Sequence, residues 1–206
     1  PPRSTLFPYT TLFRSDEFVF GMEHAAMPFI RTDLGLNYDQ IGLLFTIPST
    51  IAIFIEMIFG VLGDGWGRKW IVIGGGIGFV IACTLSAVSQ NFTMLLLSFI
   101  IFFPSSGGFV TLSQAILMDI EPTRHQQNMA RWTFAGSLGV VGGSLIFGIW
   151  GDWRALYLVC AILAAGALGV ILFYYISNKA PQEAVQGSNA DEDWSFRDGL
   201  KEALGQ

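Results

Sequence analysis

The chain has 206 residues, of which 52% are hydrophobic and only 13% are charged, and its net charge at pH 7 is −5. Soluble globular domains carry about 25% charged residues, so most of this chain is expected not to face water. The acidic balance also excludes a basic surface for nucleic-acid phosphates. The apolar residues fall in blocks of about 20, which is the length of a membrane-spanning helix. Because these blocks are too continuously apolar for barrel strands, we predict an all-α membrane protein.

The N-terminal segment needs separate treatment. Residues 1–15, PPRSTLFPYTTLFRS, resemble the in-frame translation of a widely used short-read sequencing adapter. We interpret them as an artefact and exclude them from the fold. The biological sequence is then expected to begin at Asp16.

Six apolar blocks follow, and they predict a bundle of six transmembrane helices. The first block is about half as long as a bilayer requires, so we interpret it as a truncated span. A Pro-Ser-Ser-Gly-Gly run at residues 104–108 is expected to interrupt the fourth. Small residues recur every four positions in several blocks, at Gly74 and Gly78 in the third, Gly139 and Gly143 in the fifth, and Ala165 and Gly169 in the sixth. This spacing is typical of close helix packing in membranes. The predicted spans cover residues 18–30, 41–62, 70–88, 94–118, 130–150 and 155–176.

The sequence changes character after the sixth block. Residues 177–190 are polar and predict a flexible linker. The stretch from Trp194 to Gln206 has apolar residues at helical spacing and predicts a short amphipathic helix at the membrane surface. We therefore expect residues 177–206 to form a cytoplasmic linker, beyond which a second bundle would begin.

Basic residues predict the orientation of the bundle. The side that holds the loop between the second and third spans carries seven lysines and arginines, whereas the other side carries two, Arg31 and Arg154. Because basic loops stay in the cytoplasm, both ends of this bundle are expected to be cytoplasmic, in the plasma or inner membrane.

The loop between the second and third spans carries the most specific motif. Residues 60–69 read GVLGDGWGRK, which resembles the G-x-L-[AG]-D-[RK]-x-G-R-[RK] signature of the major facilitator superfamily. Gly65 departs from the usual basic residue. The resemblance covers residues 16–206 and implies the N-terminal six-helix half of a twelve-span secondary transporter. In the family this loop is implied to latch the two halves, through Gly60, Asp64, Gly67, Arg68 and Lys69.

Two further stretches bear on the resemblance. Asp152-Trp153-Arg154 before the sixth span is similar to a family feature. The glycine-rich stretch at residues 136–143 resembles the proton-antiporter motif but lacks its proline, and the fourth span lacks the arginine of the proton-linked motif. Both departures leave symport, antiport and the coupling ion open.

The resemblance implies alternating-access transport of a small solute, driven by a proton or solute gradient. A membrane sensor or scaffold without transport is the alternative. An intramembrane enzyme is disfavoured because it would need a nucleophile with its base or paired metal ligands at membrane depth, and the only histidines are His24 and His125. We expect no cofactor and no metal. The expected partners are the solute, the bilayer and a C-terminal half.

Ionisable groups at membrane depth are the candidates for solute or proton binding. Glu56 lies within the second span, as either a coupling carboxylate or a structural partner of a group such as Arg131. Glu23 and His24 lie side by side in the first span and are expected to act together. Gln114 in the fourth span is the best uncharged contact. A cytoplasmic charge network is expected from Asp119, Glu121, Arg124 and Arg131.

Overall fold

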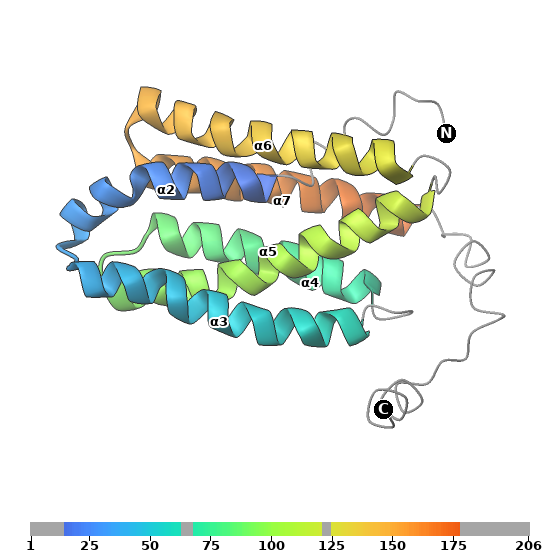
Figure 1. Ribbon diagram of the computed structural model, residues 1–206, viewed down its shortest axis with the longest axis horizontal. Coiled ribbons are helices and arrows are strands. Elements are labelled where there is room, and N and C mark those ends of the chain that lie inside the picture. The colour runs from blue at the N-terminus through green and yellow to red at the C-terminus, as the bar shows by residue number, and fades with distance from the viewer. Residues whose placement is uncertain (1–14, 63–67, 121–124, 178–206) are drawn as a thin grey trace. The chain divides into compact units, whose positions relative to one another are not determined.

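The computed structural model describes the backbone of residues 15–62, 68–120 and 125–177, and the side chains of residues 16–59, 70–109, 126–169 and 172. Within these ranges every regular element is a helix (Figure 1). The predicted adapter segment (residues 1–15) and linker (residues 177–206) lie outside the description except for Ser15 and Ser177, which belong to the terminal helices. The helices are α2 (Ser15–Leu34), α3 (Tyr38–Leu62), α4 (Arg68–Ala87), α5 (Phe92–Ile120), α6 (His125–Trp150) and α7 (Trp153–Ser177).

The described helices include four that are long and apolar enough to cross a membrane. These are α3, α4, α5 and α6, with apolar stretches of 18 to 25 residues. In α7 the described apolar stretch, Trp153–Gly169, is shorter. The first helix, α2, has 20 residues, beyond the 13 of the predicted apolar block, but Asp16 and Glu17 lie in its first turn.

The predicted interruption of the fourth span is wrong. Helix α5 is α-helical from Phe92 to Ile120 and passes through Pro104 and the two glycines without a break. Proline removes one backbone donor, but the small residues after it let neighbouring helices approach. A Cβ atom on Gly108 would lie 2.8 Å from the ring of Phe59 in α3 and 3.3 Å from Ile71 in α4. The run therefore serves helix packing and exposes no broken backbone.

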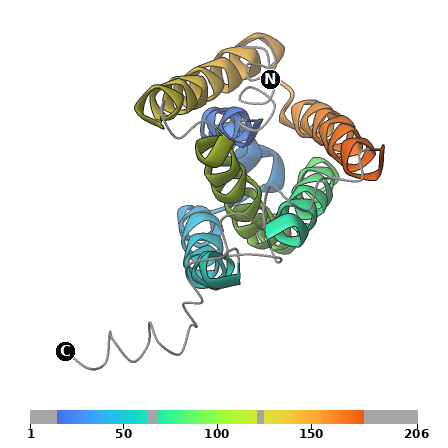
Figure 2. The same cartoon turned by 90° about the vertical axis from the view of Figure 1, so that its right-hand side faces the viewer.

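Two kinds of contact hold the bundle together up to Leu168, the end of its first compact unit. The closest backbone packing joins α4 to α5, α2 to α6 and α3 to α5. Figure 2, which looks along the helices, shows α2 and α5 between the other four. The second kind is a core of buried side chains with several aromatic rings, among them Phe79, Phe99, Phe102 and Tyr157.

The turns at one end of the bundle are defined by capping. Gly35, with φ of +63°, ends α2, and the Leu36 amide donates to the Arg31 carbonyl at 2.9 Å. This is the Schellman arrangement that closes many helices. Asn37 and Gln40 then exchange side-chain to backbone hydrogen bonds of 2.7 and 2.9 Å at the start of α3. Such a reciprocal pair satisfies two amides that the first turn leaves free.

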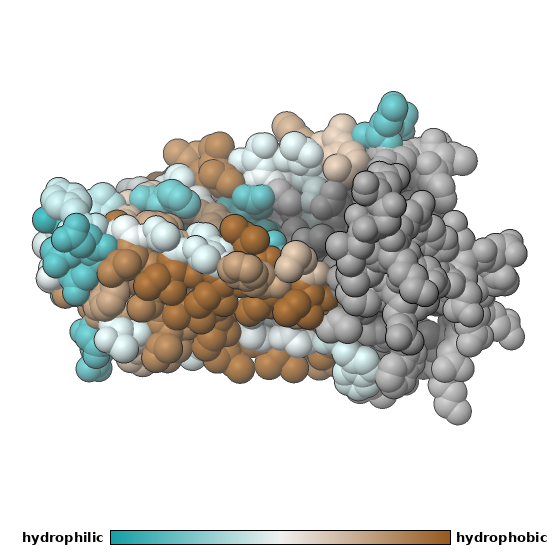
Figure 3. Space-filling model, turned by 60° about the horizontal axis from the view of Figure 1, so that its bottom comes forward, coloured by the Kyte–Doolittle hydropathy of each residue, from teal (hydrophilic) through white to brown (hydrophobic). Residues whose placement is uncertain are grey.

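Large apolar side chains also lie on the outside of the bundle. In α3, Ile53, Phe54 and Met57 are more than 60% exposed, and in α6 Ile149 is 87% exposed. Figure 3 shows a broad hydrophobic band along one face, next to a hydrophilic end. Apolar patches of this kind are rare on soluble monomers but are required on a surface that contacts lipid or another transmembrane helix.

Candidate functional site

Among the described side chains, the carboxylate with the least exposure is Glu23 in α2. Its side chain is 0% exposed, and that of Tyr157 in α7 is 1% exposed. The Tyr157 hydroxyl lies 3.5 Å from Glu23 Oε2 and is oriented to donate to it, at the long limit of a hydrogen bond. The second carboxyl oxygen, Oε1, is buried and has no hydrogen-bond partner. Burial this complete is set by α2 and its neighbours within the bundle, independently of any surrounding lipid.

The surroundings of Glu23 are apolar or weakly polar. Cys83 of α4 and Cys160 of α7 are free, buried thiols that lie close enough to interact electrostatically with the Glu23–Tyr157 pair. Met22 and Ala26, one residue before and three after Glu23, belong to the buried core. Thus the described structure brings one carboxyl group, one phenol and two thiols together, without a cationic side chain.

His24 does not share this site, although it was expected to act with Glu23. Consecutive helix residues point about 100° apart, so His24 faces outward while Glu23 faces inward. The His24 Nδ1 atom lies 2.8 Å from the Phe20 carbonyl of its own helix. Its ring lies 5.5 Å from that of Phe45 in α3. His24 is exposed and therefore accessible to a solute, whereas Glu23 is not.

Glu56 in α3 is held against α5. A Cβ atom on Gly107 would collide with the Glu56 carboxyl group, so this carboxyl group occupies the space left by the missing side chain. The Glu56 side chain is otherwise exposed. Among the described residues, no ion pair joins Glu56 to Arg131, which is exposed on α6. Glu56 is thus an accessible carboxylate that packs against Gly107 of α5.

The remaining predicted site residues fall outside the part that the structure describes. Gly60, Arg68 and Lys69 lie at the ends of α3 and α4, without described side-chain positions. The same applies to Gln114 and Asp119 in α5. Of the motif and the cytoplasmic charge network, Asp64, Gly67, Glu121 and Arg124 lie outside the described backbone as well.

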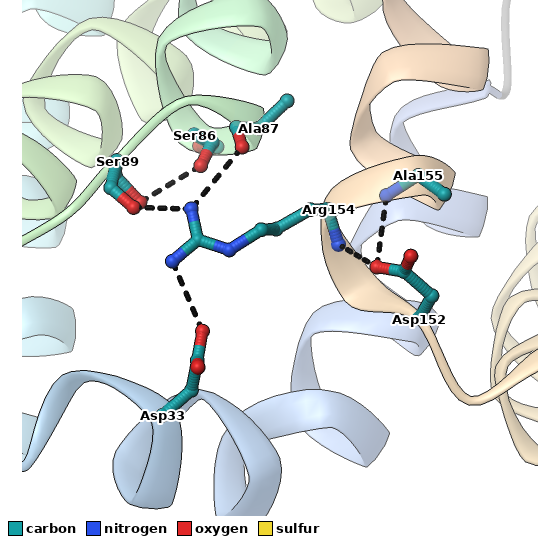
Figure 4. Close-up of polar contacts among 7 residues, drawn as sticks. All are labelled: Asp33, Ser86, Ala87, Ser89, Asp152, Arg154 and Ala155. Atoms are coloured by element: carbon teal, nitrogen blue, oxygen red, sulfur yellow. Dashed lines mark hydrogen bonds and ion pairs between the residues drawn. The ribbon is translucent and has the colours of Figure 1, made fainter.

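A polar cluster that the sequence did not predict lies at the capped end of the bundle. Arg154, in the first turn of α7, donates to the carbonyls of Ala87, at 3.3 Å, and Ser89, at the end of α4 (Figure 4). Its other nitrogen, Nη2, pairs with Asp33 of α2 at 3.0 Å. Asp152 caps α7 by accepting from the amides of Arg154 and Ala155 at 3.0 and 3.1 Å. We call Asp33, Ala87, Ser89, Asp152 and Arg154 the rim cluster.

The rim cluster ties together the ends of three helices. A guanidinium group presents several donors in one plane, so it can bind two carbonyls and a carboxylate at once. The Arg154 side chain is 34% exposed and that of Asp33 is 49% exposed. An open cleft of about 700 Å³ lies beside the cluster and is lined by residues that include Phe29, Asp33 and Trp153. The sequence signal was the resemblance of Asp152-Trp153-Arg154 to a family feature, which does not indicate the distant partners.

The comparisons with known proteins agree with this architecture. The family model described as Major Facilitator Superfamily matches residues 18–205. Quinolone resistance protein NorA of Staphylococcus aureus is 29% identical over 155 residues, which cover 74% of this chain and 39% of NorA. The MFS-type efflux transporter phmH of Phaeosphaeria nodorum is 33% identical over 106 residues, 50% of this chain and 19% of phmH. The chain therefore spans well under half the length of these curated relatives.

A solved structure shows the same fold. The crystal structure of the human organic anion transporter MFSD10 (TETRAN) superimposes with a TM-score of 0.71 at 21% identity, covering 98% of this chain and 53% of that one. Together with the apolar helices, this confirms the predicted all-α bundle of a multi-pass membrane protein. Because the family model matches nearly the whole chain, the resemblance seen in the loop motif is confirmed, and the chain belongs to the Major Facilitator Superfamily.

Proposed function

We propose that this chain is the N-terminal half of a secondary transporter that moves a small organic solute across the plasma membrane by alternating access. The observation that carries the proposal is the match of the family model to residues 18–205. The names of the relatives, a quinolone resistance protein, an efflux transporter and an organic anion transporter, support an organic solute. The coverage of 53% of MFSD10 supports a second bundle of similar size.

The family match supports transport rather than catalysis. His24 and Glu56 are single polar groups on outward faces of α2 and α3. We propose these two as solute or coupling contacts, together with Gln114. The basic loop at residues 60–69 would act as the cytoplasmic gate, supported by Arg124, Arg131, Asp119 and Glu121, with both ends of the bundle inside the cell.

Flux through the complete protein tests this proposal. The open reading frame would be extended to its stop codon, and the product reconstituted into proteoliposomes. Uptake of a quinolone would be followed by its fluorescence under an imposed pH gradient and under a matched membrane potential. We expect uptake that depends on a gradient and saturates with quinolone concentration. If liposomes with the protein equal empty liposomes for quinolones and for organic anions, the sensor or scaffold alternative is favoured.

Glu56→Gln separates a coupling role from a packing role. If Glu56 couples the gradient, this variant should lose at least about tenfold of gradient-driven flux, equivalent to about 1.4 kcal/mol, while counterflow of labelled against unlabelled solute continues. Asp39→Asn is the matched control, since Asp39 is an exposed carboxylate in the first turn of the same helix. An unchanged pH dependence in Glu56→Gln would remove Glu56 as a coupling group.

A further inference from the structure

We infer that Glu23 and Tyr157 form a proton-binding site inside the bundle, between α2 and α7, apart from the outward-facing groups that a solute could touch. Its use in energy coupling rests on the proposed function, but the existence of the site does not. The ligand is a single proton, which converts the Glu23 carboxylate into a neutral carboxylic acid.

The first step is a count of donors and acceptors. An ionised carboxylate offers about four lone-pair positions and no donor. The one hydrogen bond described for this carboxylate comes from the Tyr157 hydroxyl, at 3.5 Å from Oε2, and Oε1 has none. One long hydrogen bond leaves most of the acceptor positions of an ionised Glu23 carboxylate unused. A protonated carboxyl group has fewer acceptor positions to satisfy and carries no charge.

The second step is charge. Of the elements around Glu23, α7 contributes Tyr157 and Cys160, and α4 contributes Cys83. The described side chains of α5 include no acidic, basic or histidine residue, and α6 has only the exposed Arg131. A buried carboxylate without a cation loses its hydration, and the single long hydrogen bond from Tyr157 replaces little of it. The interior thus favours the protonated form.

The third step is access. Helices α2 and α6 cross with backbone in contact, but α2 and α7 are not among the closely packed pairs. They meet instead through side chains, the Glu23–Tyr157 pair among them. For Glu23 to release its proton, an acceptor such as water must reach its buried carboxyl group, and we place this access at the α2–α7 contact, where side chains rather than backbone meet. Proton release is thereby linked to a change in helix packing, which is the kind of event that a transport cycle requires.

Infrared spectroscopy of the purified chain in lipid nanodiscs tests the site without any transport assay. A protonated carboxyl group has a C=O stretching band that an ionised one lacks. At pH 7 we expect such a band in the wild-type chain, its loss in Glu23→Gln and its retention in Asp39→Asn, the matched control at an exposed carboxylate of α3. Tyr157→Phe should keep the band but shift it, because the acid loses its hydrogen-bond partner.

The outcomes are separable. If Glu23→Gln does not fold, the shift in Tyr157→Phe still assigns the band to this pair. A wild-type spectrum without a protonated carboxyl band at pH 7 overturns the inference, as does a band that Glu23→Gln leaves intact or that Tyr157→Phe leaves unmoved. If the band is present but the complete protein carries no solute, the proposed function fails and the proton site stands. If the complete protein transports a solute but the chain shows no protonated carboxyl band, the proton site is refuted and the proposed function stands.

Discussion

Helix α2 contacts α6 and α7 in different ways. Toward α6 the contact is made by backbone: a Cβ atom on Gly143 would collide with the Phe18 carbonyl, and one on Gly21 with the Val140 carbonyl. The Ser144 hydroxyl adds a hydrogen bond of 2.9 Å to the Gly21 carbonyl. Toward α7 the contact is made by long side chains, Glu23 and Tyr157. Close backbone packing at glycines fixes the α2–α6 interface, whereas polar side chains form the α2–α7 contact.

The two contacts are expected to differ in how much helix movement they tolerate. Backbone contact through glycine tolerates almost no change in helix separation, because interiors are closely packed. A pair of long side chains can break and re-form with little change in the rest of the core. We therefore expect α2 and α6 to move as one body and the α2–α7 contact to be the adjustable one. The predictions below break each kind of contact in turn.

The largest effect is expected from Gly143→Leu. Its Cβ atom would lie on the Phe18 carbonyl and 2.9 Å from the Met22 amide, and neither backbone group can move aside. We expect a loss of more than about 3 kcal/mol, the upper end for overpacked sites, with little folded protein recovered. The measurement is thermal unfolding in detergent, combined with size-exclusion chromatography.

Gly148→Leu is the control for Gly143→Leu. Gly148 lies on the same helix, and a Cβ atom there would meet nothing within 4 Å. The midpoint temperature of its thermal unfolding should stay within error of the wild-type value or rise slightly, since Leu is a better helix former than Gly. Equal losses in the two variants would contradict the claim that backbone contact fixes the α2–α6 crossing.

The glycine pattern shows what the sequence can and cannot predict. Small residues every four positions predicted close packing, and Gly78 and Gly143 are indeed at helix crossings. The same pattern included Gly74 and Gly169, where a Cβ atom would meet nothing within 4 Å, and it passed over Gly75, which faces Ser105. Spacing identifies helices that can pack closely, but the partner and the face depend on the whole bundle.

Polar contacts between distant segments were harder to predict. Glu23 and His24 are adjacent in sequence, yet their side chains point about 100° apart along the helix. Tyr157 and Arg154 find their partners 134 and 121 residues away, at Glu23 and Asp33. No local pattern encodes such pairs. Single-residue signals, such as a carboxylate inside an apolar block, point to the position of a site but not to its composition.

The second prediction concerns Arg154→Ala. This change removes the rim-cluster contacts that hold the start of α7 against α2 and α4. The change leaves the Ala87 and Ser89 carbonyls without their donor and removes the ion pair with Asp33. Hydrogen bonds to a charged group contribute roughly 1.5–3 kcal/mol, and the partial exposure of Arg154 places the expected loss near the lower value. Unfolding in nanodiscs, followed by tryptophan fluorescence, is the measurement.

Asp33→Asn separates the carbonyl contacts from the ion pair. Since both charged side chains are partly exposed, the pair itself should contribute less than about 1 kcal/mol. Arg154→Ala should therefore be clearly more destabilising than Asp33→Asn. If the two variants lose equally, the ion pair rather than the α4 carbonyls fixes the end of α7.

A third prediction uses two glycines where an added Cβ atom would meet nothing within 4 Å. Gly35 and Gly42 both have open space where a Cβ atom would be, but Gly35 has φ of +63° whereas Gly42 lies inside α3. Gly35→Ala should destabilise by about 1 kcal/mol because it places a side chain in left-handed conformation. Gly42→Ala should stabilise by up to about 1 kcal/mol through helix propensity. Paired unfolding curves would show opposite shifts; shifts of the same sign would mean that packing outside the described residues decides both.

The smallest effect is expected in the tight α4–α5 interface, from Ser86→Ala. The Ser86 and Ser98 hydroxyls lie 2.9 Å apart and join the two helices, while Ser98 also donates to the Leu95 carbonyl of its own helix at 2.7 Å. Interhelical hydrogen bonds in membrane proteins contribute about 0.6 kcal/mol on average, because helices that separate find other partners. A double-mutant cycle with Ser98→Ala measures the coupling by thermal unfolding. Glycines already allow α4 to pack closely on α5. A coupling energy much larger than this average would show that the serine hydrogen bond, and not close packing alone, fixes this interface.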